Sequence, residues 1–246
     1  MKADPDAQRR LLDLQAIDTA LAQLAHRRRN LPELAEVARF AREIASGSDD
    51  RARAQVAVDD LDRDITRIER DTEQVRARKD KDRARLDAGS GPARELEALQ
   101  HEMASLQRRQ SELEDAELDL MEQREQAQGV LDELERRLAT AREGHADAES
   151  RRDAALTDIG QEEESRTAMR GPLVADLPSD LVALYERIRE QTGGVGAALL
   201  RGGRCEGCRL ELSGSERARV RAAAPDEVLQ CDECRRILVR TPESGL

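Results

Sequence analysis

The chain has 246 residues, of which 38% are charged and 38% hydrophobic, and its formal net charge is −11 at pH 7. Phe40 and Tyr185 are its only aromatic residues, and because large globular cores depend on buried aromatic area, this composition argues against such a core. The acidic balance disfavours non-specific attraction of the whole molecule to nucleic acid or to an anionic membrane.

The N-terminal segment MKADPDAQRR is polar, and no apolar signal-peptide core follows it. No apolar run approaches the ~20 residues that are needed to span a bilayer. We therefore expect a cytoplasmic protein without a membrane partner. In a reducing compartment, four cysteines arranged in two pairs suggest metal binding before disulfide formation.

Residues 6–170 carry almost no strand signal. Ala, Leu, Glu, Asp, Arg and Gln dominate, which is typical of long helices, with disorder as the competing interpretation. An apolar repeat argues against disorder, because apolar residues recur in alternating steps of three and four, as in coiled coils. This seam covers residues 14–24, 58–75 and 96–159. The sequence thus predicts long helices that bury a stripe against a partner helix.

Three interruptions divide this helical region. The phase of the repeat slips at Asn30-Leu31-Pro32, which predicts a kink near 30–32, and Gly47-Ser48 is a second candidate break. The segment 87–92, DAGSGP, predicts a turn with Pro92 at the first position of the next helix. The arms on either side are nearly equal in length, so residues 1–171 are predicted to form an antiparallel coiled-coil hairpin. Two long helices that dimerise in parallel are the alternative, but they leave the turn unexplained.

Residues 172–246 are predicted to form a second domain. Gly171-Pro172 is expected to end the second arm, because proline disfavours helix at the residue before it. Ser179 or Asp180 can cap a helix over 181–190, and residues 195–200 read as a strand. Two further strand-like runs, 228–229 and 237–239, flank the last cysteine pair. The fold class is therefore mainly α, a long antiparallel coiled-coil hairpin with a small C-terminal α+β domain.

The four cysteines form two identical motifs. Cys205 and Cys208 make one Cys-x2-Cys pair, and Cys231 and Cys234 make the other after a gap of 22 residues. Two such turns complete a tetrahedral S4 site with bonds of ~2.3 Å, and four thiolates leave no position for a catalytic water. We expect structural Zn²⁺, while an iron S4 centre or a redox dithiol are the alternatives. Metal binding would supply the folding free energy that so short and aromatic-poor a segment lacks.

Several stretches together resemble the bacterial C4-type zinc-ribbon family, in which a long coiled-coil hairpin precedes a C-terminal zinc ribbon. They are LEALQHE (96–102), SLQRRQSELED (105–115), DLMEQRE (119–125), LPSDLVALYERIR (177–189), CEGC (205–208) and CDECRRILVR (231–240). The resemblance implies an adaptor role, since some relatives look like partners of an alternative sigma factor, of messenger RNA or of secretion components. Family ribbons usually place glycine after the last cysteine, where this chain has Arg235, and such a knuckle favours a positive φ there.

An enzyme is not expected. The histidines His26, His101 and His145 lie on predicted helix and away from any Ser or Cys motif, and the segment TGGVG (192–196) lacks the Lys and Ser/Thr of a phosphate-binding loop. We expect a non-enzymatic adaptor that binds protein partners and takes no small-molecule substrate.

The alternative function is RNA or DNA binding by the basic hairpin tip and the ribbon arginines. The absence of aromatic residues from the candidate contact segments counts against it, because base stacking needs them. The candidate contact residues are Arg76, Arg78, Lys79, Lys81, Arg83, Arg85, Arg235, Arg236 and Arg240.

Overall fold

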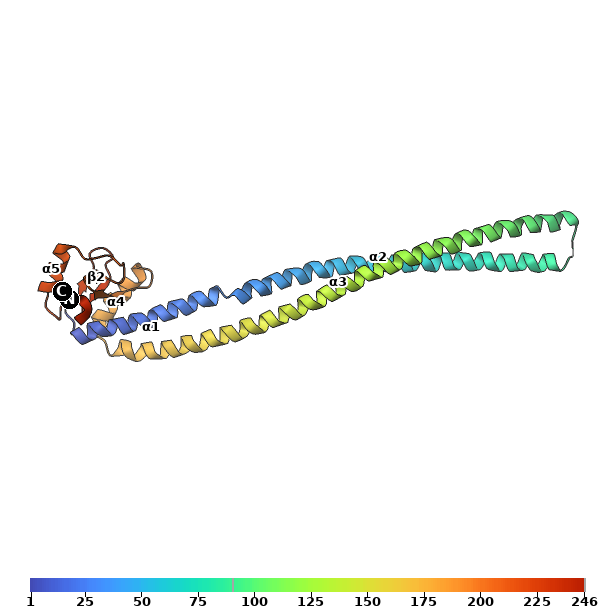
Figure 1. The fold of residues 1–246 in the computed structure, drawn as a ribbon. Coiled ribbons are helices and arrows are strands. Elements are labelled where there is room, and N and C mark those ends of the chain that lie inside the picture. The colour runs from blue at the N-terminus through green and yellow to red at the C-terminus, as the bar shows by residue number, and fades with distance from the viewer. Residues whose placement is uncertain (90, 246) are drawn as a thin grey trace. The chain divides into compact units, whose positions relative to one another are not determined.

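The computed structural model describes residues 1–89 and 91–245. Three long helices dominate it, α1 (Pro5–Arg29), α2 (Pro32–Asp87) and α3 (Ala93–Ala175) (Figure 1). Ser90, in the predicted turn near 87–92, lies outside the described residues. The contacts group into two compact units, Ala35–Glu149 and a second one made of Met1–Leu34 and Ser150–Leu246. Among the described residues, no helix combines the length and apolar character that crossing a membrane requires.

In the unit Ala35–Glu149, α2 and α3 pair in antiparallel fashion. Buried seam residues include Val58, Leu113, Leu131 and Leu138, as the apolar repeat predicts. Ion pairs cross between the helices in an order that descends along α3 as it ascends along α2: Arg51–Glu135, Asp62–Arg124, Arg76–Glu114 and Arg78–Glu102. The predicted hairpin of two long helices is thereby confirmed.

A short break separates α1 from α2 at the predicted position. The Asn30 backbone N–H donates to the carbonyls of His26 and Arg27, and Leu31 is buried before Pro32 begins α2. Proline suits this position because the first turn of a helix needs no intrahelical N–H donor. The second candidate break was wrong, because Gly47-Ser48 lies inside α2.

The expected end of the second arm at Gly171-Pro172 was also wrong, since α3 continues to Ala175. Proline inside a helix removes one hydrogen bond, but Leu173 and Val174 beyond it pack against the core of the unit that contains them. Burial of these two side chains favours one further helical turn. The Asp176 N–H then donates to the Pro172 carbonyl.

The rest of the chain forms the ribbon domain. Helix α4 (Ser179–Gln191) begins after Pro178, which is its N-cap in place of the expected Ser179 or Asp180. Four short strands form one sheet in the order β2-β1-β4-β3, where β1 and β4 are parallel and the other pairs antiparallel. The strands are β1 (Ala197–Arg201), β2 (Arg204–Cys205), β3 (Leu229–Gln230) and β4 (Ile237–Val239).

A helix that was not predicted, α5 (Gly214–Ala222), lies between the two cysteine pairs, and a 3-10 turn, η1 (Pro242–Ser244), follows β4. The Ser213 hydroxyl caps α5 by accepting from the Glu216 N–H. Serine followed three residues later by glutamate is a recognised helix-start signal. The helix was therefore readable from the sequence.

The ribbon shares its main core with the N-terminal helix. This core joins α1, α4, β1 and β4, and its fully buried members include Leu11, Leu14, Leu181, Tyr185, Ile237 and Val239. The first residues of the chain extend the contact, since the Ala3 N–H donates to the Asp226 carbonyl and Lys2 forms a β-bridge with Glu227. α1 thus contributes directly to the folding of the C-terminal domain.

Candidate metal centre and the structure that supports it

Two equivalent turns, here called knuckle 1 (205–209) and knuckle 2 (231–235), hold the cysteines. In knuckle 1 the Arg209 N–H donates to the Cys205 carbonyl at 2.7 Å, and in knuckle 2 the Arg235 N–H donates to the Cys231 carbonyl at 2.9 Å. Both arginines have a φ of 63°. The prediction of a positive φ at Arg235 is confirmed, and Arg209 repeats it, although this region is uncommon for residues other than glycine.

The four thiols converge on one point. Their Sγ atoms all lie within 4.8 Å of one another; Cys205 and Cys234 are 3.8 Å apart, and Cys208 and Cys231 are 3.9 Å apart. A tetrahedral S4 site with bonds of ~2.3 Å requires sulfur–sulfur distances of about 3.8 Å. The donor set therefore fits Zn²⁺, and with four protein ligands it is a closed, structural type of site.

Burial and hydrogen bonds shift the pKa values of three of these thiols. Burial raises the pKa of the Cys231 thiol to about 11 and raises the pKa of the Cys205 thiol further. Burial also acts on Cys234, but hydrogen bonds from the Arg236 backbone and side chain outweigh it and lower the pKa of that thiol. Because metals bind thiolates, occupancy of this site displaces protons.

Polar side chains outside the cysteine pairs fix the knuckles in place. The buried Glu216 of α5 accepts a hydrogen bond from the Asp232 N–H of knuckle 2 at 3.0 Å. Arg236 donates to the carbonyls of Val195, Gly207 and Thr192. Glu216 and Arg236 therefore tie both knuckles to the rest of the ribbon.

Arg240 has a similar structural position. Its guanidinium donates to the carbonyls of Val220, Ala223, Ala224, Pro225 and Glu227. The donors of Arg236 and Arg240, two candidate contact residues, are therefore used inside the domain. Arg235, the third ribbon candidate, is exposed, and its side chain forms no hydrogen bond or ion pair within the described part of the chain.

The six candidate cations of the hairpin tip fall into two groups. Lys81, Arg83 and Arg85 are exposed and have no ion pair among residues 1–89 and 91–245. The other three have partners within the hairpin: Arg76 with Glu114, Arg78 with Asp82 and Glu102, and Lys79 with Gln107 and Gln110. A structural role accounts for this second group.

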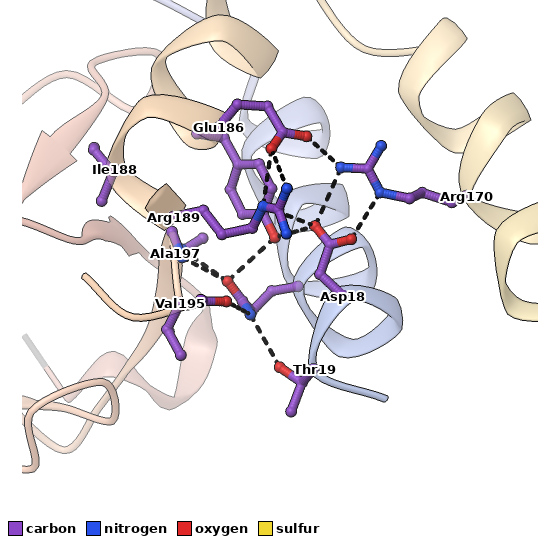
Figure 2. A network of polar contacts seen from close by, with 12 residues as sticks. Asp18, Thr19, Arg170, Glu186, Ile188, Arg189, Val195 and Ala197 are labelled. Carbon is purple, nitrogen blue, oxygen red and sulfur yellow. Dashed lines mark hydrogen bonds and ion pairs between the residues drawn. The ribbon is translucent and has the colours of Figure 1, made fainter. Parts of the chain in front are cut away.

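A buried polar network joins α1, α3, α4 and β1 (Figure 2). Asp18 is 4% exposed, and it accepts from Arg170 Nε at 2.7 Å and from the Tyr185 hydroxyl at 2.8 Å. Glu186 accepts from both Arg170 and Arg189. Burial and then the hydrogen bond to Asp18 raise the pKa of Tyr185 well above its ordinary value.

Gln15 extends this network to the start of β1. Its Oε1 accepts from the Tyr185 hydroxyl and from the N–H groups of Gly196 and Ala197, while its Nε2 donates to Gly194 and Thr19. Sequence reasoning missed Gln15 and Asp18 because all their partners except Thr19 lie more than 150 residues away. Their only signal is two polar residues beside Leu14 and Ile17 on the apolar face of α1.

These features define the class of protein, a long helical hairpin that carries a four-cysteine ribbon. Comparison with known proteins agrees. Residues 14–193 match the CT398-like coiled coil hairpin domain, and residues 204–238 match the C4-type zinc ribbon domain. The chain therefore belongs to the CT398-like coiled-coil hairpin family with a C4-type zinc ribbon, as the sequence resemblance implies.

The relatives span nearly the full length of the chain. An uncharacterized protein of Mycobacterium tuberculosis is 41% identical over 240 residues, which are 98% of each chain. A solved structure from Mycobacterium smegmatis is 38% identical, with a TM-score of 0.84 over 98% of this chain and 100% of that one. CT398 from Chlamydia trachomatis, at 21% identity, shares the fold, with a TM-score of 0.65 over 95% and 97% of the two chains. Neither matched domain is described as an enzyme.

Proposed function

We propose that the protein is a non-enzymatic cytoplasmic adaptor, which binds protein partners through its hairpin and through a ribbon held by structural zinc. The observation that carries this proposal is the division of the tip cations into three that contact other side chains of the hairpin and three that do not. Arg76, Arg78 and Lys79 bond to side chains within the hairpin. Lys81, Arg83 and Arg85 are exposed, and their side chains form no hydrogen bond or ion pair in the described structure. Charges that the fold does not use are available to a partner.

The arrangement of these cations favours an acidic protein segment over nucleic acid. On a helix, residues four apart share a face, whereas residues two apart do not. Lys81 and Arg85 therefore form one patch, and Arg83 lies on another face. Two cations on one face give few phosphate contacts, and the surrounding molecule is acidic.

The test reverses the charge of this patch. Cells expressing the wild type, the double variant Lys81→Glu/Arg85→Glu or a control are treated with a cross-linker, and the captured proteins are quantified by mass spectrometry. The control is Arg63→Glu/Arg67→Glu, which makes the same charge change on exposed α2 residues with the same spacing. A defined set of proteins should be captured by the wild type and the control but at least about tenfold less by the tip variant. Equal capture by both variants would contradict the proposal.

RNA or DNA binding is the second candidate function, because the same unpaired cations could contact phosphates. Fluorescence anisotropy with mixed-sequence RNA across a salt series measures this directly. Two phosphate contacts predict a slope of log affinity against log salt of roughly −1.4 for single strands. A slope several times steeper, lost in the tip variant, would favour nucleic acid over a protein partner.

A further inference from the structure

Strand β1 has a short stretch of unpaired edge. Residues two apart in a strand direct their backbone groups to the same edge. On one edge, Gly196 accepts from the Ile237 N–H of β4 at 2.9 Å. On the other, the Leu199 carbonyl accepts from the Glu206 N–H at 3.0 Å, and the Ala197 N–H donates to Gln15 at 3.3 Å. The Ala197 carbonyl and the Leu199 N–H are left without a hydrogen-bond partner among residues 1–89 and 91–245.

This unpaired edge borders a groove of about 420 Å³ between α1 and knuckle 1. Figure 2 shows Val195 and Ala197 on the ribbon side and Thr19 on α1. Ala16 and Ala20 also line the groove from α1, and these small side chains leave its space open. The groove walls are therefore largely apolar, with backbone donor and acceptor groups at the edge of the sheet.

The pattern of used and unused backbone groups excludes a closely spaced antiparallel pair. A residue in a parallel neighbouring strand donates its N–H to one residue of the strand beside it and accepts from the residue two positions further on. The free carbonyl of Ala197 and the free N–H of Leu199 have this spacing. A closely spaced antiparallel pair would need both groups of a single residue, but the Ala197 N–H and the Leu199 carbonyl are already bonded. An antiparallel segment can use the two free groups only as a widely spaced pair.

The charge of the groove lining indicates which kind of partner fits it. The lining of the groove contains no cation, and Glu206 is its one charged residue. A nucleic acid would meet a carboxylate and no counter-charge there. A peptide with a lysine or arginine close to its paired residue would instead place opposite charges together.

We propose that this groove binds an extended segment of a partner protein, which pairs with β1 through the Ala197 carbonyl and the Leu199 N–H. The segment lays small apolar side chains against α1 and directs a basic side chain to Glu206. This is strand addition to a sheet edge, in which backbone hydrogen bonds give affinity and the groove walls give specificity. The inference rests on the proposed adaptor function and assigns one of its binding sites.

Amide hydrogen exchange followed by NMR tests the edge in the free protein. The Leu199 N–H should exchange roughly 2- to 12-fold faster than the hydrogen-bonded N–H groups of Ile237 and Glu206, the range expected for one hydrogen bond. Equal protection of Leu199 and Ile237 would mean that the edge is not open, and would overturn the proposal.

Selection of peptides from a random library displayed on phage tests the groove. The exposed Ala16 is replaced in Ala16→Glu, which fills the groove with a carboxylate, and the control is Ala22→Glu, at an exposed α1 residue outside the groove. Circular dichroism and zinc content verify that both variants are folded. Selected peptides should bind the wild type and the control equally, and Ala16→Glu at least about tenfold more weakly.

N-methylation at a single peptide position should weaken binding by a similar factor, because it removes the N–H that pairs with the Ala197 carbonyl. The proposed site would be overturned if no selected peptide binds Ala16→Glu more weakly than the wild type. It would also be overturned if the wild type self-associates and Ala16→Glu does not, because the groove would then hold a second copy of the chain. The adaptor function is judged separately by the tip variant Lys81→Glu/Arg85→Glu, so the two failures are distinguishable.

Discussion

The Phe40 ring of α2 occupies the space where a side chain at Gly144 of α3 would lie. A Cβ added at Gly144 would be 2.5 Å from Phe40 Cζ. The Arg39 guanidinium lies 3.9 Å from the centroid of the same ring, a cation–π contact. The single phenylalanine of the chain therefore packs across the hairpin because its opposite position has no side chain.

We expect Gly144→Ala to destabilise the hairpin. Alanine favours helix over glycine by about 1 kcal/mol, but overpacking a filled site costs about 1–3 kcal/mol. Because the steric term is the larger, the free energy of unfolding should fall, as measured by urea denaturation. The control is Gly129→Ala, also inside α3, where nothing lies within 4 Å of the added Cβ; it should stabilise by about 1 kcal/mol. Phe40→Leu should reduce the loss of stability caused by Gly144→Ala. If it does not, the clash with the Phe40 ring is not the cause of that loss.

The buried ion pair of Asp18 with Arg170 gives a second prediction. Asp18→Ala leaves the Arg170 guanidinium without its main partner, and such a change costs about 3–5 kcal/mol. Asp13→Ala, at an exposed position of the same helix, should change the free energy of unfolding by about 0.5 kcal/mol or less. Chemical denaturation of the zinc-loaded protein measures both, and similar values for the two variants would contradict a stabilising network.

The raised pKa of Tyr185 predicts that the protein loses stability in alkali. Its pKa is raised in the folded protein, whereas in the unfolded chain it is ~10. The folded state thus keeps a proton that the unfolded state releases, so the stabilisation is complete below pH ~10 and declines as the pH rises above that value. With one tyrosine and no tryptophan in the chain, the tyrosinate absorbance band reports the ionisation of Tyr185 alone. Tyrosinate should appear only together with loss of helix by circular dichroism. Reversible titration near pH 10 in fully helical protein would be the contrary result.

Metal removal should affect the two units differently. Chelation, or Cys231→Ser, removes a ligand set on which β1, β4 and both knuckles depend, so protection from hydrogen exchange should fall in the ribbon. It should also fall at the start of α1 and in α4, which share the ribbon's core. The segment Ala35–Glu149 has its own contacts and should keep its protection, and added zinc should restore the chelated wild type. Loss of protection throughout Ala35–Glu149 would show that the units are not independent.

The sequence alone was sufficient to predict the elements that depend on local repeats. The heptad seam predicts the burial of Leu113, Leu131 and Leu138, because in a coiled coil the spacing itself decides which residues face the partner. The cysteine spacing likewise predicts the cluster of four thiols, since a two-residue spacer brings both sulfurs of a pair to one metal.

Features that depend on distant contacts could not be derived in this way. Proline at 172 is a local signal to end a helix, and burial of Leu173 and Val174 overrides it. The roles of Arg236 and Arg240 are equally non-local, because in the sequence they resemble free basic residues and only the fold brings backbone carbonyls around them. Local chemistry is readable from a sequence, whereas the choice between an external and an internal partner for an arginine is not.

The contacts of Lys2 and Ala3 with residues 226–227 affect the order in which parts of the protein fold during synthesis. The Lys2 ammonium pairs with Asp226, 224 positions along the chain. A ribosome therefore releases the first strand-like residues long before their partners exist, while the segments of Ala35–Glu149 can pair as soon as the second arm emerges. Domains generally fold as units during synthesis, and long-range contacts form slowly because a large loop must close first. The hairpin should thus be assembled before the ribbon, and the N-terminal residues should remain accessible to chaperones and proteases until the ribbon has captured them.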